Sequence, residues 1–409
     1  MEKLAIRGGT PVCTTKFPSW PQHDEREREL LHQVLESSRW GGTAHGPMVM
    51  ELNARFCDYH DALFGIPLTS CTAGLDIGLR AFDIGPGDEV IVPAFTFMAT
   101  AFAPMYVGAD VVFADVDPNS LCLDPAAVAA AITPRTRAII PVHFGGYPAQ
   151  IDELGAIAKA HDLAVIVDCA HAHGTEWAGK KVGGWGDLNS YSFNQAKNMT
   201  CGEGGLATTD NEALWERCFY TLACFGRKNG RPWYEHHELG QAYPMNEFQA
   251  AVCLPQLERL DEHTKRRNQN AAYLSSMLTG IPGLTVQELA PEVTQHGYHI
   301  YPMRLDAEEF GTDRETFLQA VQAEGIGMSS GYPWPLYDNP MFDESDGSVK
   351  GSIGGFRAEP CPVTERLCHE EAAWIGQTTL LADQSAMDDI ATAIAKVQRN
   401  VDQLQAVYS

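Results

Sequence analysis

The sequence predicts an α/β protein built on a mostly parallel β-sheet that is covered by helices on both faces. Short apolar runs alternate with helix-compatible stretches from about residue 68 to residue 210, which is typical of this fold class. The apolar runs are nearly continuous rather than interleaved with polar residues, as expected for strands that are buried on both sides. With 409 residues, the chain is long enough for this sheet and for a second domain.

The alternation defines six strands and four intervening helices. The expected strands are Glu89–Pro93, Val111–Val116, Arg137–His143, Ala164–Asp168, Asn189–Phe193 and Leu206–Thr209. The expected helices are Ala73–Phe82, Met98–Val107, Pro125–Ile132 and Ile151–His161. Binding sites in such sheets gather beyond the carboxyl ends of the strands. Asp168 and His143 each stand at such an end, so both are expected at the functional edge.

The pattern changes after Gly205. Two helices are expected, at Asn211–Ala223 and Asn246–Leu260, and a polar stretch without periodicity separates them. This stretch, Phe225 to Tyr243, is either a surface loop or a loop that closes an active site, its own or a neighbouring subunit's. Its basic and aromatic residues are Arg227, Lys228, Arg231, Trp233, Tyr234, His236 and His237.

The predicted domain organisation is a large domain of residues 1–255 and a small C-terminal domain of residues 256–409. The elements expected in the small domain are a helix at Arg266–Leu278, a strand at Tyr298–Leu305, a helix at Thr312–Glu324, a proline-punctuated loop at Gly331–Pro340 and a long helix from Met387 to about Val407. The chain shows neither internal repeats nor low-complexity segments.

Composition narrows the class of protein. Hydrophobic residues make up 44% and charged residues 20%, as in ordinary soluble proteins. There is neither an apolar run of the roughly 18 residues that span a membrane nor a signal peptide, so a cytoplasmic protein is expected. The net charge of −24 disfavours nucleic acid as a partner. The 11 cysteines are scattered without a Cys-x-x-Cys pair, which argues against a disulfide framework or a zinc ribbon.

Lys197 and Asp168 form the most informative pair of residues. Lys197 lies between an apolar run ending at Phe193 and the glycine-rich turn Gly202–Gly205, whereas Asp168 ends another predicted strand. Pyridoxal phosphate needs an amine that forms a Schiff base with its aldehyde and a carboxylate that pairs with its protonated pyridine nitrogen. A lone lysine is usually a solvated surface residue, but this combination predicts a pyridoxal phosphate site.

A phosphate cradle and an aromatic partner for the ring are also expected. Ser70 to Gly74 are small residues directly before a helix, where unpaired N–H groups attract anions, although serine at a helix start is often only an N-cap. One of Phe95 and Phe97, with Phe97 preferred, is expected to stack on the ring.

His171 and His173 alternate along the chain, so both imidazoles could lie on one face. Metal binding is disfavoured because no further Cys, His or Asp set stands nearby at ligand spacing. His171 is instead expected to contact the cofactor's phenolic oxygen, and His173 is expected to be structural.

Four blocks of this sequence resemble, in the same order, those of the DegT/StrS-type sugar aminotransferases. The blocks are Ser70-Cys71-Thr72-Ala73, Pro93-Ala94-Phe95-Thr96-Phe97, Asp168-Cys169-Ala170-His171-Ala172-His173-Gly174 and the Ser192-Phe193 to Gly202-Glu203-Gly204-Gly205 stretch around Lys197. The resemblance extends from Trp40 to the final helix. It implies the fold-type-I architecture of pyridoxal 5′-phosphate enzymes, with a mostly parallel seven-stranded sheet sandwiched by helices and a smaller C-terminal α/β domain. It also implies a homodimer whose active sites lie at the subunit interface.

The resemblance also implies a role for each site residue. Lys197 would be the Schiff-base lysine and proton shuttle, and Asp168 would hold the pyridine nitrogen. Phe97 would stack on the ring, and His171 would lie near the phenolic oxygen. The phosphate would be bound by Thr72, Ala73 and Ser192.

The implied reaction is transfer of an amino group from L-glutamine or L-glutamate to a keto-sugar or keto-cyclitol. The segments Gly331–Pro340 and Cys361–Leu381 look most like the scyllo-inosose aminotransferases, and the aminohydroxybenzoate synthases also look related. The sequence leaves the acceptor open among free cyclitols, sugar nucleotides and aromatic precursors.

One departure concerns the phosphate. The family usually carries an asparagine shortly before Met245 that reaches the phosphate of the neighbouring subunit, but here Ala242 occupies that stretch and cannot donate such a bond. Gln241 or Tyr243 could substitute, or the phosphate could be held less tightly.

Two alternative functions remain on this scaffold. A dehydratase of the same fold would carry histidine in place of Lys197, which argues against it. A non-catalytic regulatory homologue would be expected to lose Lys197 or Asp168, and this sequence retains both.

Overall fold

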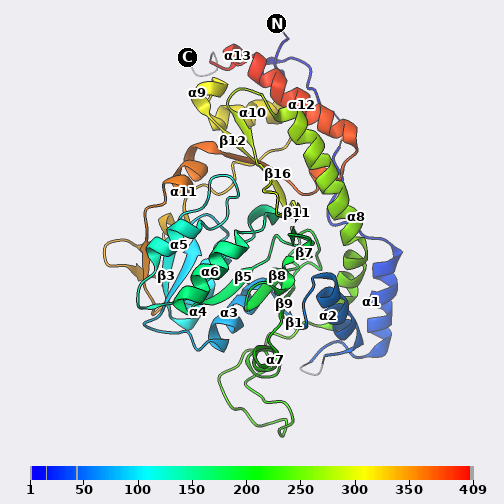
Figure 1. Cartoon of the computed structure of the whole chain (residues 1–409). Helices are drawn as coiled ribbons and strands as arrows, with labels where there is room; N and C mark the ends of the chain where they lie inside the picture. Colours follow the sequence, from blue (N-terminus) through cyan, green and yellow to red (C-terminus); the bar gives the residue numbers. More distant parts are fainter. Residues whose placement is uncertain (1, 15, 43–44, 406–409) are drawn as a thin grey trace.

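The computed structural model describes residues 2–14, 16–42 and 45–405 (Figure 1). Its main body is one sheet with the order β1-β9-β8-β5-β4-β2-β3-β15. Only β9 runs antiparallel to its neighbours among these strands. In this spatial order the strands are Phe64–Leu68, Gly205–Thr209, Leu188–Ser192, Ala164–Asp168, Thr136–Ile139, Glu89–Pro93, Asp110–Ala114 and Phe356–Ala358.

The predicted mostly parallel sheet is confirmed, with eight strands instead of seven. All six strands expected from the sequence are present, and β2 and β5 have the predicted bounds. Strand β1 was not predicted locally. The eighth strand, β15, comes from the C-terminal part of the chain and pairs in parallel with β3, Phe356 opposite Val111.

Helices cover both faces of the sheet, as predicted. Neighbouring residues of one strand enter different apolar cores: Ile91 packs on one face, whereas Val90 and Val92 pack on the other. The helices on the Val90 face are α3 (Cys71–Ala81), α4 (Ala99–Val107) and α7 (Glu212–Glu216). Those on the Ile91 face are α1 (Glu25–Ser37), α2 (Pro47–Tyr59), α5 (Pro125–Ala131), α6 (Ile151–His161) and the first half of α8 (Glu247–Leu278).

Helix α8 corrects the sequence analysis. It is one helix of 32 residues, so the predicted break between Leu260 and Arg266 is wrong. The predicted break, residues 261–265, is polar, and of these residues only Thr264 is buried. This stretch therefore shows no apolar periodicity that would mark it as helical. The expected domain boundary at residues 255 and 256 lies inside this helix.

A second, smaller core surrounds an antiparallel sheet of β10 (Leu284–Val286), β12 (Ile300–Leu305) and β16 (Ala372–Gly376). Helices α9 (Ala307–Phe310), α10 (Arg314–Ala323) and α12 (Gln384–Arg399) contribute to it. The predicted terminal helix is shorter than expected, because α12 ends at Arg399 and the short α13 (Asp402–Gln405) follows; Val407 lies outside the described residues. The remaining elements are β6 (Glu176–Trp177), β7 (Lys180–Lys181), β11 (Val293–Gln295), β13 (Phe342–Asp343), β14 (Ser348–Val349) and α11 (Pro362–Arg366).

The N-terminal segment packs on this second core rather than on the large sheet. Leu4 and Cys13 belong to its apolar cluster. The buried Glu324 carboxylate accepts the backbone N–H of Ala5 at 2.8 Å and pairs at 2.8 Å with the buried ammonium of Lys396. The segment before α1 is therefore fixed at its start by the C-terminal part of the chain.

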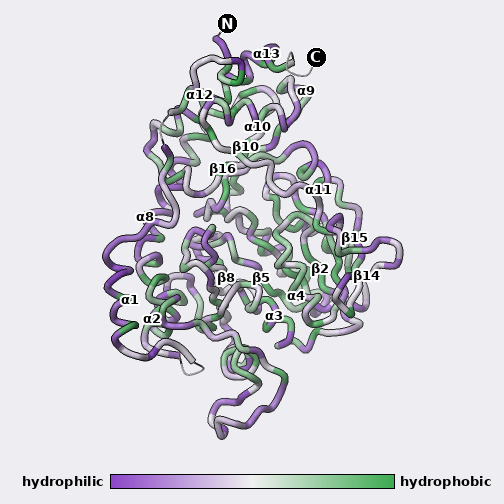
Figure 2. The backbone as a smooth tube through the Cα atoms, turned by 180° about the vertical axis from the view of Figure 1, so that it is seen from behind, coloured by the Kyte–Doolittle hydropathy of each residue, from purple (hydrophilic) through white to green (hydrophobic). Residues whose placement is uncertain are grey.

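Residues 225–243 extend away from the body below α7, as Figure 1 shows. They follow a π-helical segment, Arg217–Leu222, and carry the exposed side chains of Trp233 and Tyr234. Hydropathy elsewhere follows burial, with the strands of the large sheet mostly hydrophobic and the outer helix α1 mostly hydrophilic (Figure 2). Along residues 2–14, 16–42 and 45–405, no helix combines the length and the apolar character needed to cross a membrane.

Candidate active site

A cavity of about 520 Å³ lies at the carboxyl edge of the large sheet. Because β1, β2, β5 and β8 are parallel, the segments that follow them meet at this edge. The cavity is lined by Thr72, Phe97, Asp168, His171, Ser192 and Lys197 from the predicted site, and by Asn194, Glu203, His299, Tyr332 and Trp374, among others. Of the predicted site residues, Ala73 alone is not part of this lining.

Asp168 ends β5 with its carboxylate enclosed by donors. Oδ2 accepts the hydroxyl of Thr100 at 2.8 Å, and Oδ1 accepts the backbone N–H of Ala170 at 3.0 Å. The thiol of Cys71 lies 3.6 Å from Oδ1. Charge-assisted bonds of this kind are stronger than neutral ones, so they hold the buried carboxylate in one orientation.

Lys197 is half-buried in the turn after β8. Burial lowers the pKa of its ammonium, and the negative charge of Asp168 opposes this shift. Removal from water disfavours the charged form of an amine. The neutral form, which can attack an aldehyde, is therefore more accessible than in a solvated lysine.

The turn that carries Lys197 is anchored on both sides. Trp20 donates its indole N–H to the carbonyl of Gln195 at 2.9 Å. Asn198 donates to the carbonyl of Gly297 at 2.6 Å, and its side-chain oxygen accepts from His299 Nδ1 at 3.2 Å. Two segments that are distant in sequence, at Trp20 and at Gly297–His299, thus hold the backbone next to the amine.

The N-terminus of α3 forms one end of the cavity. Ser70 is its N-cap and accepts the N–H of Ala73 at 3.1 Å. Ala73 is buried beneath this turn and its N–H is already engaged, whereas the half-buried Thr72 and the buried Ser192 both line the cavity. Gly205 is required here, because a Cβ at this position would lie 2.3 Å from the carbonyl carbon of Ser70.

The two candidate aromatic residues occupy different environments. Phe95 is buried in a cluster with Phe144 at 5.1 Å and Tyr332 at 5.4 Å between ring centroids. Phe97 is 62% exposed and lines the cavity. Of the two rings, only Phe97 has a face available to a ligand.

His171 lines the cavity as a neutral ring. Burial and the nearby charge of Lys197 hold its pKa well below the usual value. Its Nδ1 accepts the N–H of Gly145 at 3.2 Å, so the ring proton lies on Nε2, which can donate. His299 stacks on it at 4.1 Å between centroids. His173 is buried beside Tyr191 and Phe193 and is not part of the lining.

Several residues of this cavity were missed by the sequence analysis. Thr100 lies behind the lining, where it donates to Asp168, and nothing local in the sequence indicated this contact. His299, Tyr332 and Trp374 come from distant parts of the chain, so nothing local in the sequence connected them with Lys197.

The residues considered as substitutes for the missing asparagine have partners within their own subunit. Tyr243 donates its hydroxyl to Asp76 Oδ2 at 3.2 Å. The backbone of Gln241 pairs with Leu222 and Phe225, and its side chain is half-buried. Whether Gln241 or Tyr243 substitutes for the asparagine, or the phosphate is held less tightly, stays untested.

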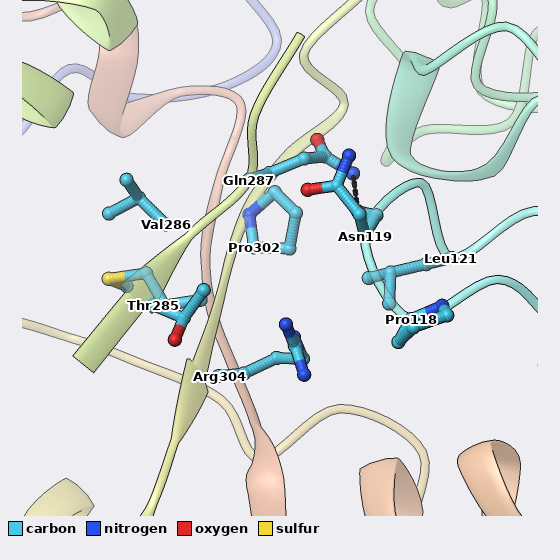
Figure 3. A pocket seen from close by; sticks show the side chains of 9 residues that line it. Pro118, Asn119, Leu121, Thr285, Val286, Gln287, Pro302 and Arg304 are labelled. Carbon is cyan, nitrogen blue, oxygen red and sulfur yellow. Dashed lines mark hydrogen bonds between the residues drawn. The ribbon is translucent and has the colours of Figure 1, made fainter. Parts of the chain in front are cut away.

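A second, shallow hollow lies between the turn at Pro118–Leu121 and the strands β10 and β12 (Figure 3). It is bridged by Gln287, which donates to the carbonyl of Asn119 at 2.9 Å. It shares no lining residue with the Lys197 cavity and brings no acid–base pair together.

Comparison with known proteins identifies the family of this chain. The profile of the DegT/DnrJ/EryC1/StrS aminotransferase family matches residues 21–395. The chain is 39% identical over 414 residues to a putative L-glutamine:3-amino-2,3-dideoxy-scyllo-inosose aminotransferase of Streptoalloteichus tenebrarius, covering 98% of this chain and 99% of that protein. It is 37% identical over 419 residues to the L-glutamine:scyllo-inosose aminotransferase of Streptomyces griseus, covering 97% and 98%.

Among solved structures, 3-amino-5-hydroxybenzoic acid synthase superposes with a TM-score of 0.84 at 31% identity, covering 93% of this chain and 98% of that one. The family profile spans most of the chain, and the named relatives match nearly its full length. The protein therefore belongs to the DegT/DnrJ/EryC1/StrS aminotransferase family.

Proposed function

We propose that the protein transfers the amino group of L-glutamine or L-glutamate to the keto group of a cyclitol or sugar, with pyridoxal 5′-phosphate as cofactor. The observation that carries this proposal is the convergence of Asp168 and Lys197, from the adjacent parallel strands β5 and β8, in one cavity at the N-terminus of α3. The inosose aminotransferases among the relatives support glutamine as donor and a keto-cyclitol as acceptor.

The residues present fit the cofactor. Asp168 would pair with the ring nitrogen, Phe97 would stack on the ring, and His171 Nε2 would donate to the phenolic oxygen. The phosphate would be held by the α3 N-terminus and the hydroxyls of Thr72 and Ser192. When bound, the cofactor supplies an aldehyde that takes up the amino group and a ring that withdraws electrons from the substrate carbon.

The protein's own part in the chemistry rests on Lys197. Its Nζ would link to the cofactor between turnovers and, once released, would carry a proton between the cofactor carbon and the substrate carbon. The aromatic residues Tyr332 and Trp374 would exclude water from this transfer.

The cavity favours an acceptor without phosphate groups. Among the described residues that line it, Lys197 is the only lysine or arginine, and burial lowers the pKa of both His171 and His299. A diphosphate would need several cationic donors, which the lining from this subunit does not supply, whereas a cyclitol needs only neutral hydrogen-bonding groups.

We expect glutamine to bleach the visible absorbance of the cofactor-loaded protein, and a keto-cyclitol to restore it. A panel of inososes, keto-sugars and sugar nucleotides, scored by mass spectrometry with glutamine as donor, would identify the acceptor. A spectrum that does not respond to glutamine or glutamate would contradict amino transfer. A product that has lost water instead of gaining nitrogen would favour a dehydratase related to 3-amino-5-hydroxybenzoic acid synthase.

We also propose a homodimer in which residues 225–243 enter the neighbouring subunit's site. The loop extends from the body and exposes large side chains, with Trp233 72% exposed, in a chain of net charge −24. Arg227, Lys228 and Arg231 could meet a donor carboxylate or the neighbour's phosphate.

Mixing two inactive variants, Lys197→Ala and Arg227→Ala, tests this arrangement. A heterodimer would contain one site with both residues intact, so random mixing should restore about a quarter of the wild-type activity. Mixing Lys197→Ala with Asp168→Asn is the matched control and should restore nothing, because both residues belong to the same subunit's site. If the loop mixture also stays inactive after verified subunit exchange, the loop does not serve the neighbour.

A further inference from the structure

Two threonine hydroxyls form a directional chain that ends on Asp168. Thr100, fully buried in α4, donates to Asp168 Oδ2 at 2.8 Å. Thr96, in the turn after β2, places its Oγ1 3.3 Å from Thr100 Oγ1. Each hydroxyl has one hydrogen, and a carboxylate only accepts. Since the hydrogen of Thr100 is directed at Asp168, Thr96 must donate to Thr100.

The other carboxylate oxygen is held from a different element. Oδ1 accepts the N–H of Ala170 at 3.0 Å, in the turn after β5. The thiol of Cys71 lies closer to the carbonyl of Ser190, at 3.2 Å, than to Oδ1, at 3.6 Å, so it contributes less. The two strong donors, Thr100 and Ala170, therefore grip opposite oxygens and prevent the carboxylate from rotating.

We infer that Thr100 is a positioning residue: its hydroxyl fixes the plane of the Asp168 carboxylate toward the ring nitrogen of pyridoxal 5′-phosphate, and Thr96 fixes Thr100. This inference rests on the proposed function. An alternative role for the same bonds is purely structural, joining α4 to β5 without any effect on the cofactor. Only the positioning role predicts that loss of the Thr100 hydroxyl changes the spectrum of the bound cofactor.

The test compares cofactor-loaded Thr100→Val with Thr100→Ser. Valine keeps the shape of threonine and removes the hydroxyl, whereas serine keeps the hydroxyl. Thr264→Val is the matched control, because Thr264 is a fully buried threonine of α8 whose hydroxyl has no hydrogen-bond partner among the described residues. The measurements are visible circular dichroism of the bound cofactor, the pH dependence of its absorbance, and kcat and KM for glutamine.

Thr100→Val should weaken the dichroism and lower kcat roughly tenfold, with the KM for glutamine within about twofold of wild type. A poorly oriented carboxylate stabilises the protonated ring nitrogen less. The pH at which the bound ring nitrogen loses its proton should therefore move down by about one unit. Thr100→Ser and Thr264→Val should match wild type in all of these measurements. Thr96→Val should change them in the same direction by a smaller amount.

A Thr100→Val protein that melts at a lower temperature but keeps the wild-type dichroism, pH transition and kcat would overturn the inference in favour of the structural role. If Thr100→Val does not fold, the test uses Thr96→Val, which keeps the hydrogen bond from Thr100 to Asp168 and removes only the support of Thr100. A wild-type spectrum and pH transition in Thr96→Val would also overturn the inference. A wild-type protein that shows no bound-cofactor spectrum would reject the proposed function itself, and the inference with it.

Discussion

Replacing Lys197 with alanine is expected to lower turnover by on the order of 10⁴-fold or more, because the substitution removes both the covalent attachment and the proton carrier. The amine lies on a turn held by Trp20 and Asn198, so another lysine cannot readily take its place. Turnover would be measured with glutamine and the best acceptor of the panel. Borohydride reduction of the cofactor-loaded wild type, followed by peptide mapping, should place the label on Lys197.

Lys159 provides the control for this experiment. It is an exposed lysine of α6, and Lys159→Ala should retain wild-type turnover and labelling. Label on any lysine other than Lys197 would refute the assignment.

Asp168→Asn is expected to fold normally and to lose about 10³-fold in turnover. The amide oxygen can still accept the N–H of Ala170, and the hydroxyl of Thr100 can reverse its role and accept from the new NH₂ group. An amide cannot, however, stabilise a protonated ring nitrogen as a carboxylate does. Breaking a buried charge pair on one side commonly costs about 3–5 kcal/mol, and a 10³-fold loss corresponds to about 4 kcal/mol.

Thermal unfolding of this variant separates the two effects. An unchanged melting temperature together with the loss of turnover would assign the cost to catalysis. Turnover near that of the wild type would show that Asp168 does not face the ring.

Local sequence predicted six of the eight strands of the large sheet because each of those six carries its own signal. The apolar runs at Glu89–Pro93 and Ala164–Asp168 are buried on both faces, and their pattern gave the observed bounds. Strand β15 has only three residues, and it becomes a strand because β3 offers it a free edge. That edge is a property of the folded sheet, so the segment around Phe356 carried no local signal.

In helix α8 the sequence predicted a break where the structure has one continuous helix. The predicted break, residues 261–265, resembles a linker because it is polar and only Thr264 among these residues is buried. Periodicity detects a helix by its apolar face, so a turn of α8 without one was missed.

The residues of the site likewise include some that the sequence predicted and some that it did not. Lys197, Asp168 and Phe97 stand beside strand ends and could be placed from the sequence. His299 and Tyr332 reach the cavity only through tertiary packing, and Thr100 became informative only when its distance to Asp168 was known.

The attachment of the N-terminal segment to the C-terminal part of the chain has a consequence for synthesis on the ribosome. Leu4 donates its N–H to Gln403 Oε1 at 3.1 Å, across 399 residues of sequence, and Ala5 donates to Glu324. At roughly 5–20 residues per second, Leu4 and Ala5 wait on the order of 20–80 s after their own synthesis for these partners. During that interval Leu4 and Cys13 lack the core that later buries them. A nascent-chain chaperone that covers apolar segments would therefore have this whole interval in which to bind the segment around Leu4 and Cys13.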